Sequence, residues 1–186
     1  MFDDATVLFT DFKEFTLTSE FLTPIELVSD LNNCFSAFDK IIQEYNIEKI
    51  KTIGDAYLAA GGLPTPNYTH TKDVVLAALR IRDFIKKGKA EKIAQNLPFF
   101  EIRVGIHTGP VVAGIVGVKK FQYDIWGDTV NTASRIESNG EAGKINISHS
   151  TYELLKDDPD FIFDIRGKIE AKGKGKINMY FIELKE

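Results

Sequence analysis

Apolar and polar residues alternate along this chain with two periods, one typical of strands and one typical of helices. Apolar and β-branched residues at 5–10 predict a strand, and apolar residues at every second position of 100–106 predict another. Apolar residues three or four positions apart predict two amphipathic helices. The expected buried faces consist of Val28, Leu31, Phe35, Phe38, Ile42 and Tyr45 in the first helix and Val74, Ala78, Ile81 and Ile85 in the second.

Local signals predict where these helices begin and end. Thr23, Pro24 and Glu26 form a helix start, with Thr23 as the N-cap and Glu26 completing a capping box. The segment 86–89, with its three lysines and a glycine, is expected to end the second helix, because cations favour the negative end of the helix dipole. Cys34 lies beside the apolar face of the first helix, where we expect a packed core thiol.

The remaining pattern predicts further strands and the fold class. Residues 48–62 read as two short strands joined by a tight turn at Gly54–Asp55, and Gly109–Pro110 is expected to turn one strand into the next. Further helices are expected at 128–138 and 151–155, and further strands at 111–116, 144–148, 161–165 and 177–184. Hairpin-paired strands with helices returning over one face predict an α+β fold, with a ferredoxin-like βαββαβ core and additional C-terminal strands and helices.

Two aspartates stand at the ends of predicted strands. Asp11 ends the first strand, and Asp55 is at the tip of the turn between the next two. If the fold brings them together, they form the paired carboxylates that hold a divalent metal ion on phosphate oxygens. The alternative is that both are ordinary turn residues, because Asp is common in turns.

Length and composition narrow the class of protein. The chain has 186 residues, 44% of them hydrophobic and 27% charged, so we expect a single domain over residues 1–186 with a sizeable core. A net charge of −4 argues against nonspecific nucleic-acid binding. A lone cysteine excludes an internal disulfide, and no apolar run approaches the ~20 residues that span a bilayer. We therefore expect a cytoplasmic domain. The first strand begins within a few residues of Met1, as it would in an excised catalytic domain, so we expect that a longer protein can have a sensor or membrane segment upstream.

Four sequence blocks, in order, make the chain resemble one enzyme family. They are LFTDF at 8–12, KTIGDAY at 51–57, RVGIHTG at 103–109 and YDIWGDTVNTASR at 123–135. Together they resemble the catalytic domain of class III nucleotidyl cyclases, the adenylate and guanylate cyclases, over nearly the whole chain. The resemblance implies a dimer with the nucleotide at the subunit interface. The products would be a 3′,5′-cyclic nucleotide and pyrophosphate.

The resemblance assigns a metal site to the two aspartates. Asp11, Asp55 and the backbone carbonyl of Phe12 would hold two Mg²⁺ or Mn²⁺ ions per active site. Two such ions suit the chemistry, because they lower the pKa of the ribose 3′-hydroxyl and offset charge on the triphosphate. The junction after Phe12 has backbone N–H groups that can face an anion, so Phe15 and Thr16 are expected to bind substrate.

Four more residues match positions with roles in the family. Arg135 of the second subunit would stabilise the charge that develops at the α-phosphate, and Asn131, on the same helix face, would position the ribose. Arg103 and Lys172 match positions that contact the β- and γ-phosphates in relatives. The alternatives are a surface helix arginine for Arg135 and, for Lys172, an edge strand protected by lysines.

Lys51 and Asp124 match the pair that reads adenine in adenylate cyclases. Guanylate cyclases usually carry Glu and Cys, or a similar small residue, at these positions. An ammonium group donates to N1 of adenine and a carboxylate accepts from its exocyclic amine, whereas guanine presents the reversed pattern. We therefore predict a homodimeric adenylate cyclase that uses ATP at two interfacial sites.

Other functions stay open at this point. One is a guanylate or relaxed-specificity cyclase, and another is a catalytically silent nucleotide-binding dimerisation domain. The complete set of Asp11, Asp55, Asn131 and Arg135 argues against the silent domain. A polymerase-like palm also joins two carboxylates to such a core, but it does not account for the last of the four blocks. Glu14 departs from the family, which often has Gly there, and we expect its side chain to point outward.

Overall fold

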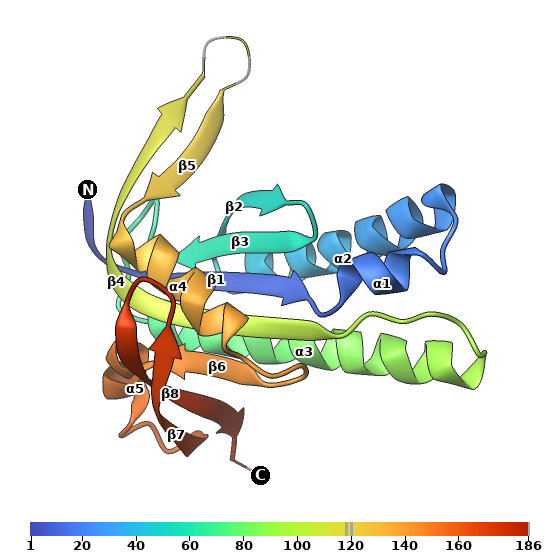
Figure 1. Cartoon of the computed structure of the whole chain (residues 1–186). Coiled ribbons are helices and arrows are strands. Elements are labelled where there is room, and N and C mark those ends of the chain that lie inside the picture. The colour runs from blue at the N-terminus through green and yellow to red at the C-terminus, as the bar shows by residue number, and fades with distance from the viewer. Residues whose placement is uncertain (118, 120, 186) are drawn as a thin grey trace.

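The computed structural model describes residues 1–117, 119 and 121–185 (Figure 1). Within them, the strands are β1 (Phe2–Phe12), β2 (Glu48–Ile53), β3 (Ala56–Gly61), β4 (Ile102–Val116), β5 (Gln122–Trp126), β6 (Ile145–Ser148), β7 (Phe161–Ala171) and β8 (Gly175–Leu184). The helices are α1 (Phe15–Ser19), α2 (Pro24–Glu44), α3 (His70–Ala94), α4 (Asp128–Ser138) and α5 (His149–Leu155). Within the described ranges, no helix combines the length and the apolar character needed to cross a membrane.

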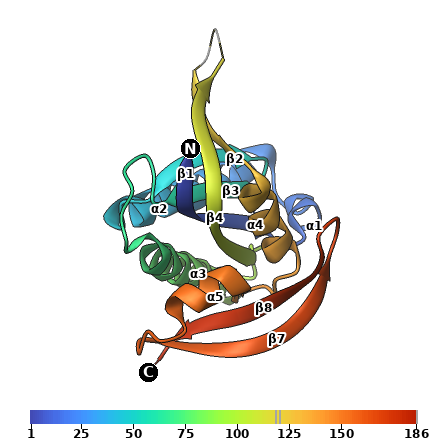
Figure 2. The ribbon, with the colours of Figure 1, turned by 90° about the vertical axis from the view of Figure 1, so that its left-hand side faces the viewer.

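One sheet, in the order β2-β3-β1-β4-β6-β8-β7, forms the centre of the fold. β1 lies between β3 and β4 and pairs antiparallel with both, whereas β4 and β6 are parallel. β5 pairs only with the outer part of β4, and these two strands project from the body as an arm (Figures 1 and 2). This architecture confirms the predicted α+β fold class.

β1 separates two hydrophobic cores, because its side chains alternate between the faces of the sheet. Leu8 faces one core, together with Phe38 of α2 and Val74 of α3. Val7 faces the other core, together with Ala133 of α4. The two long helices therefore cover one face of the sheet and α4 covers the other.

The helix α2 begins as predicted but is buried over a shorter length than predicted. Thr23 Oγ1 accepts from the Glu26 backbone N–H at 3.3 Å, and the Glu26 carboxylate accepts from the Thr23 N–H at 2.8 Å, which completes the capping box. The buried residues of α2 begin at Phe38, whereas Val28 is 65% exposed. The predicted buried face is wrong at Val28 because the first half of α2 extends beyond the sheet (Figure 1).

Cys34 on α2 is a free, partly buried thiol packed against the main core. Burial raises its pKa to about 11. The prediction of a packed core thiol is confirmed.

The helix α3 does not end at the segment 86–89, as predicted, but continues to Ala94. Lys89 donates to Glu101 at 2.6 Å and Lys92 donates to Asp30 at 2.6 Å. These ion pairs tie the last turns of α3 to neighbouring elements, so the lysines extend the packed helix instead of ending it. A glycine within the helix costs only about 1 kcal/mol relative to Ala, which such packing can outweigh.

β4 is a single strand, so the predicted turn at Gly109–Pro110 is wrong. Ala5 pairs with Gly109 and Phe2 pairs with Val111, with a register irregularity between them. The Gly-Pro pair therefore lies at a bulge, one of the places where a strand tolerates proline. Beyond this bulge β4 leaves β1 and pairs with β5, so the bulge directs the strand from the sheet into the arm.

α4 touches the backbone of β4 because two glycines on the strand leave room for it. A Cβ on Gly105 would lie 2.1 Å from the backbone N of Glu137, and a Cβ on Gly109 would lie 2.9 Å from Thr129 Oγ1. A Cβ atom does not approach another heavy atom this closely, so a larger residue at either position would force α4 or β4 to shift. The last turn of α4 is therefore held directly against the first half of β4, the strand that carries Arg103.

We predict that Gly105→Ala lowers the free energy of unfolding by about 1–3 kcal/mol, the usual cost of overpacking, because α4 must move away from β4. Urea denaturation followed by circular dichroism measures the change. Gly114→Ala on the same strand is the matched control, since its Cβ would meet Trp126 at an ordinary 3.6 Å. A Gly105→Ala variant as stable as this control would contradict the close packing.

Candidate active site

Strand pairing brings Asp11 and Asp55 together. β3 pairs with β1 so that Tyr57 stands opposite Thr10, which places the turn before β3 beside the end of β1. The turn has two residues, as predicted, and Gly54 adopts the left-handed φ of 62° that glycine permits. Burial, and next the neighbouring Asp55 carboxylate, raise the pKa of Asp11 to about 7. A cation at this pair would relieve the repulsion between the two carboxylates.

Arg103 stands opposite Asp11 in the register of β1 and β4 and connects the aspartates to α4. Its Nη2 is 3.9 Å from Asp11 Oδ2, and its Nε donates to Glu137 Oε1 at 2.8 Å. The Glu137 side chain is 3% exposed, and burial raises the pKa of this carboxyl against the opposing effect of Arg103. Glu137 therefore holds Arg103 beside the aspartate pair.

Sequence reasoning missed Glu137, although a signal was present. Val130, Ala133 and Glu137 recur at intervals of three and four residues, on the side of α4 that packs on the sheet. A carboxylate on an apolar helix face has to find a cation or hydrogen-bond donors, because burying it unpaired is costly. Its spacing thus indicates a buried partner on the sheet.

The aspartate pair fits a divalent cation that a substrate helps to bind. Mg²⁺ is often held by one or two carboxylates together with substrate phosphates, and two adjacent carboxylates supply that donor set. Phe12 follows Asp11 at the end of β1, with its ring buried in the core. No group of three His, Cys, Asp or Glu side chains that could hold a metal ion occurs in the part of the chain that the structure describes.

Lys51 and Asp124 form a second polar pair. Lys51 on β2 donates to Asp124 Oδ2 on β5 at 2.6 Å, and Asp124 Oδ1 accepts from the backbone N–H of Ile125 at 2.8 Å. Asp124 is only 7% exposed. The fold thus joins two residues that are 73 positions apart and that the family resemblance had named as a pair. They offer a donor and an acceptor side by side.

Asn131 and Arg135 lie one turn apart on α4, Asn131 exposed and Arg135 partly buried. Residues two positions apart on a helix point about 200° apart around its axis. Because Glu137 faces Arg103, Arg135 points to nearly the opposite side of α4. Arg135 and Asn131 therefore face away from the aspartate pair of their own chain.

Lys172 is exposed in the turn of the β7–β8 hairpin, between Ala171 and Gly175. Lys174 in the same turn is bound to Asp128, the first residue of α4. The hairpin tip therefore lies against the start of the helix that carries Asn131, as Figure 1 shows.

The junction after β1 is the short helix α1. The Phe15 ring packs on Phe12 and Phe100, with ring centroids 6.4 and 5.6 Å away, so this side chain is part of the core. Thr16 is exposed. Glu14 is also exposed, as predicted, and its left-handed φ of 53° is the conformation in which Gly is favoured.

Comparison with known proteins identifies the family of this site. Residues 1–184 match the family described as adenylate and guanylate cyclase catalytic domain. The chain belongs to this family. The cyclase domain is 41% identical over 182 residues to atrial natriuretic peptide receptor 2 of Rattus norvegicus, covering 97% of this chain and 17% of the receptor. It is 40% identical over 181 residues to an adenylate cyclase of Mycobacterium tuberculosis (strain ATCC 25618 / H37Rv), covering 97% of this chain and 40% of that enzyme.

A solved structure is also similar to the cyclase domain over its full length. The guanylate cyclase domain of RhGC from Catenaria anguillulae, in complex with GTP, has a TM-score of 0.89 and 34% identity, covering 100% of this chain and 98% of that chain. Relatives thus include an adenylate cyclase and a guanylate cyclase. The cyclase domain spans less than half the length of the two curated relatives that it matches.

We predict that Asp11→Asn raises the free energy of unfolding of the cyclase domain at pH 8 in EDTA. The folded pKa of about 7 lies above the ordinary value of 3.8, so in the window between these two pH values the folded protein keeps a proton that the unfolded chain has released. The stability of the unsubstituted domain therefore falls as pH rises through the window, and an amide avoids that loss.

The stabilisation should shrink as the pH falls toward 4, and urea denaturation at both pH values measures it. Asp3→Asn is the control, since Asp3 is an exposed carboxylate on the same strand and its removal should change little. An Asp11→Asn variant less stable than the unsubstituted domain at pH 8 would contradict the electrostatic picture.

Proposed function

We propose that this cyclase domain converts ATP to 3′,5′-cyclic AMP and pyrophosphate, at two sites shared between the subunits of a homodimer. The observation that carries the choice of ATP is the Lys51–Asp124 pair, joined at 2.6 Å. N1 of adenine and its exocyclic amine are an acceptor and a donor on neighbouring atoms, which an adjacent ammonium and carboxylate match. Guanine reverses both, and each mismatched buried group costs about 1–3 kcal/mol.

The triphosphate would bind at the aspartate end of the site. Asp11, Asp55 and the backbone carbonyl of Phe12 would hold two Mg²⁺ or Mn²⁺ ions there. When bound, such ions offset phosphate charge and lower the pKa of the ribose 3′-hydroxyl. Arg103, which is fixed beside the aspartates, and Lys172 in the hairpin turn would bind the β- and γ-phosphates as cations.

In the reaction the ribose 3′-oxygen attacks the α-phosphorus, the bond to the bridging oxygen breaks, and pyrophosphate leaves. Arg135 stabilises the charge that develops on the α-phosphate, where an oriented guanidinium has its largest effect on rate. Asn131 positions the ribose. Phe15 and Thr16 contribute backbone N–H groups of α1, because the Phe15 ring is packed in the core.

The direction of Arg135 supports a shared site. Glu137 faces the aspartate pair of its own chain, so Arg135 and Asn131 face away from that pair and are available to a second subunit. Two-fold symmetry then makes two equivalent sites.

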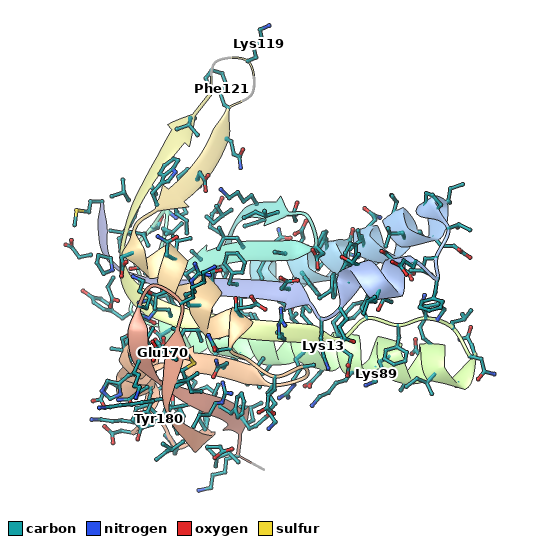
Figure 3. All side chains as sticks on the ribbon, viewed as in Figure 1. Lys13, Lys89, Lys119, Phe121, Glu170 and Tyr180 are labelled. Atoms are coloured by element: carbon teal, nitrogen blue, oxygen red, sulfur yellow. The ribbon has the colours of Figure 1, made fainter. Side chains whose placement is uncertain are left out.

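The β4–β5 arm offers apolar surface to such a partner. Ile115 is 69% exposed and Phe121 is 78% exposed. Figure 3 shows Phe121 near the tip of the arm, away from the body of the domain. Exposed apolar residues gathered on one projection are typical of an interaction surface.

The relatives that contain a matching domain are much longer than this chain. We therefore propose that residues 1–186 are one catalytic domain of a longer protein, in which a sensor or membrane segment regulates it. Guanylate cyclase activity is the second candidate function, because a GTP-bound guanylate cyclase domain has the same fold at 34% identity.

We predict that the purified domain with Mn²⁺ forms cyclic AMP from ATP at least about 10-fold more efficiently than cyclic GMP from GTP, since two mismatched contacts oppose guanine. Lys51→Glu with Asp124→Cys should lower kcat/KM for ATP and raise it for GTP. Chromatography of the products measures both activities.

Lys49→Glu is the matched control for this exchange. Lys49 lies on the same strand but pairs with Asp39 at 2.8 Å, so its replacement should leave the ATP-to-GTP ratio unchanged. Full preference for ATP in the double variant would exclude the pair from base selection. Preference of the unsubstituted domain for GTP would replace the first candidate function with the second.

We predict that Asp11→Ala and Arg135→Ala subunits, each nearly inactive alone, recover activity when mixed. Each proposed site takes its aspartates from one subunit and Arg135 from the other. In a mixed dimer one site therefore contains both substitutions and the other contains neither. Random mixing makes about half of the dimers mixed, so roughly a quarter of the unsubstituted activity should return.

A mixture of Asp11→Ala with Asp55→Ala is the control, because a lesion then remains in every site. Subunit exchange is verified by pull-down with a tag on one variant. Verified mixed dimers of the first pair without activity would argue against shared sites.

A further inference from the structure

Side chains from β6 and β7 form hydrogen bonds with the C-terminal end of α4. Asn146 on β6 is fully buried, and its Nδ2 donates to the carbonyl of Ile136 at 2.7 Å. Arg166 on β7 donates from Nη1 to the carbonyl of Asn139 at 2.6 Å and to Asn146 Oδ1 at 3.1 Å. The last carbonyls of a helix have no donors within the helix, so these bonds satisfy groups that would otherwise lack them.

Arg166 is placed to serve this helix end. Its side chain is 16% exposed, and its guanidinium lies 4.3 Å from the centroid of the Phe181 ring. Glu141, the carboxylate that it approaches, stays 4.0 Å away. The close contacts of Arg166 are therefore carbonyl and amide oxygens at the negative end of the α4 dipole, where a cation is favoured.

The carbonyl that Asn146 binds lies between two residues of the active site. Ile136 follows Arg135 and precedes Glu137 on α4. Glu137 holds Arg103 at 2.8 Å, on the side of α4 opposite to Arg135. Fixing the peptide group of Ile136 therefore fixes the directions in which both side chains leave the helix.

We propose that Arg166 and Asn146 are positioning residues that set the orientation of Arg135 through this cap. The proposal rests on the proposed function of Arg135 and extends it to two residues that lie behind α4. In this proposal the β7–β8 hairpin not only carries Lys172 but also holds α4 in place. The hairpin contacts the start of α4 through Lys174 and Asp128, and the end of α4 through Arg166 and Asn139.

Two conservative variants test the cap. Arg166→Lys keeps the charge but loses the planar fork that reaches two acceptors. Asn146→Asp keeps an oxygen for Arg166 and replaces the amide that donates to Ile136. Lys144→Ala is the matched control, because Lys144 lies 4.4 Å from the same Phe181 ring but is exposed and pairs with Glu141.

Three measurements follow, on variants shown by thermal denaturation to be folded at the assay temperature. They are kcat and KM for ATP with Mn²⁺, amide hydrogen exchange over residues 134–142, and the NMR resonance of the Arg135 Nε–H, assigned with Arg135→Lys. In both variants we expect kcat to fall about 10-fold with KM within about twofold, because a contact made only in the transition state is lost. Exchange should quicken and the resonance should shift, and the control should show none of these changes.

Unchanged kcat in both variants would overturn the proposal, even if exchange quickens, because the cap would then be only structural. A loss of kcat with unchanged exchange and an unchanged Arg135 resonance would overturn it too. If the unsubstituted domain turns over neither ATP nor GTP, the proposed function fails. The exchange and the resonance still decide in that case whether the cap orients Arg135.

Discussion

The site depends on α4 lying directly against the backbone of β4 at Gly105. With any larger residue there, a Cβ would meet the backbone of Glu137 at 2.1 Å, so the helix would have to move outward. The contact lets Glu137 reach Arg103 at 2.8 Å and thereby places Arg103 beside Asp11. Because Gly105 has no side chain, the helix that carries Arg135 can pack close to the strands that carry Arg103 and Asp11.

Burial and the carboxylates around it make the ionised form of Asp11 unfavourable in the fold by itself. Burial and the Asp55 carboxylate raise the pKa of Asp11 to about 7, which means that its charged form is disfavoured in the isolated fold. The Arg103 guanidinium lowers the pKa of Asp11, but it lies 3.9 Å from that carboxylate and donates to the Glu137 carboxylate at 2.8 Å. The fold therefore holds two adjacent carboxyl groups whose ionised forms a cation or a positively charged partner would stabilise, a pattern found at functional sites.

Local signals allowed much of the fold to be predicted. The boundaries 128–138 of α4 and the capping box at Thr23 depend on neighbouring residues and are confirmed. The prediction of a turn at Gly109–Pro110 was wrong because β4 pairs first with β1 and then with β5, and this pairing keeps the strand extended. Neighbouring residues in the sequence do not reveal such pairing. The prediction that Val28 is buried was wrong because periodicity shows which face of a helix is apolar, but not how far the sheet extends beneath that face.

The candidate site was predictable to a different extent. The approach of Asp11 and Asp55 could be expected from two strand ends, whereas the pairing of Lys51 with Asp124 was suggested by the family resemblance. Glu137, Asn146 and Arg166 were missed because their partners are backbone groups or distant side chains. The spacing of Glu137 on the apolar face of α4 indicates that it has a buried partner but not which one, and no spacing marks the partners of Asn146 and Arg166, so the folded chain is needed to identify them.

The burial of Cys34 has a practical consequence for chemical labelling. With a pKa of about 11, the thiol is almost wholly protonated at neutral pH, and only about one molecule in ten thousand carries the reactive thiolate. Maleimides and disulfide reagents react with the thiolate, so the native cysteine should stay silent under brief treatment. A single cysteine introduced at an exposed position of the arm would then carry a spectroscopic probe or cross-linker selectively, without removal of the native residue.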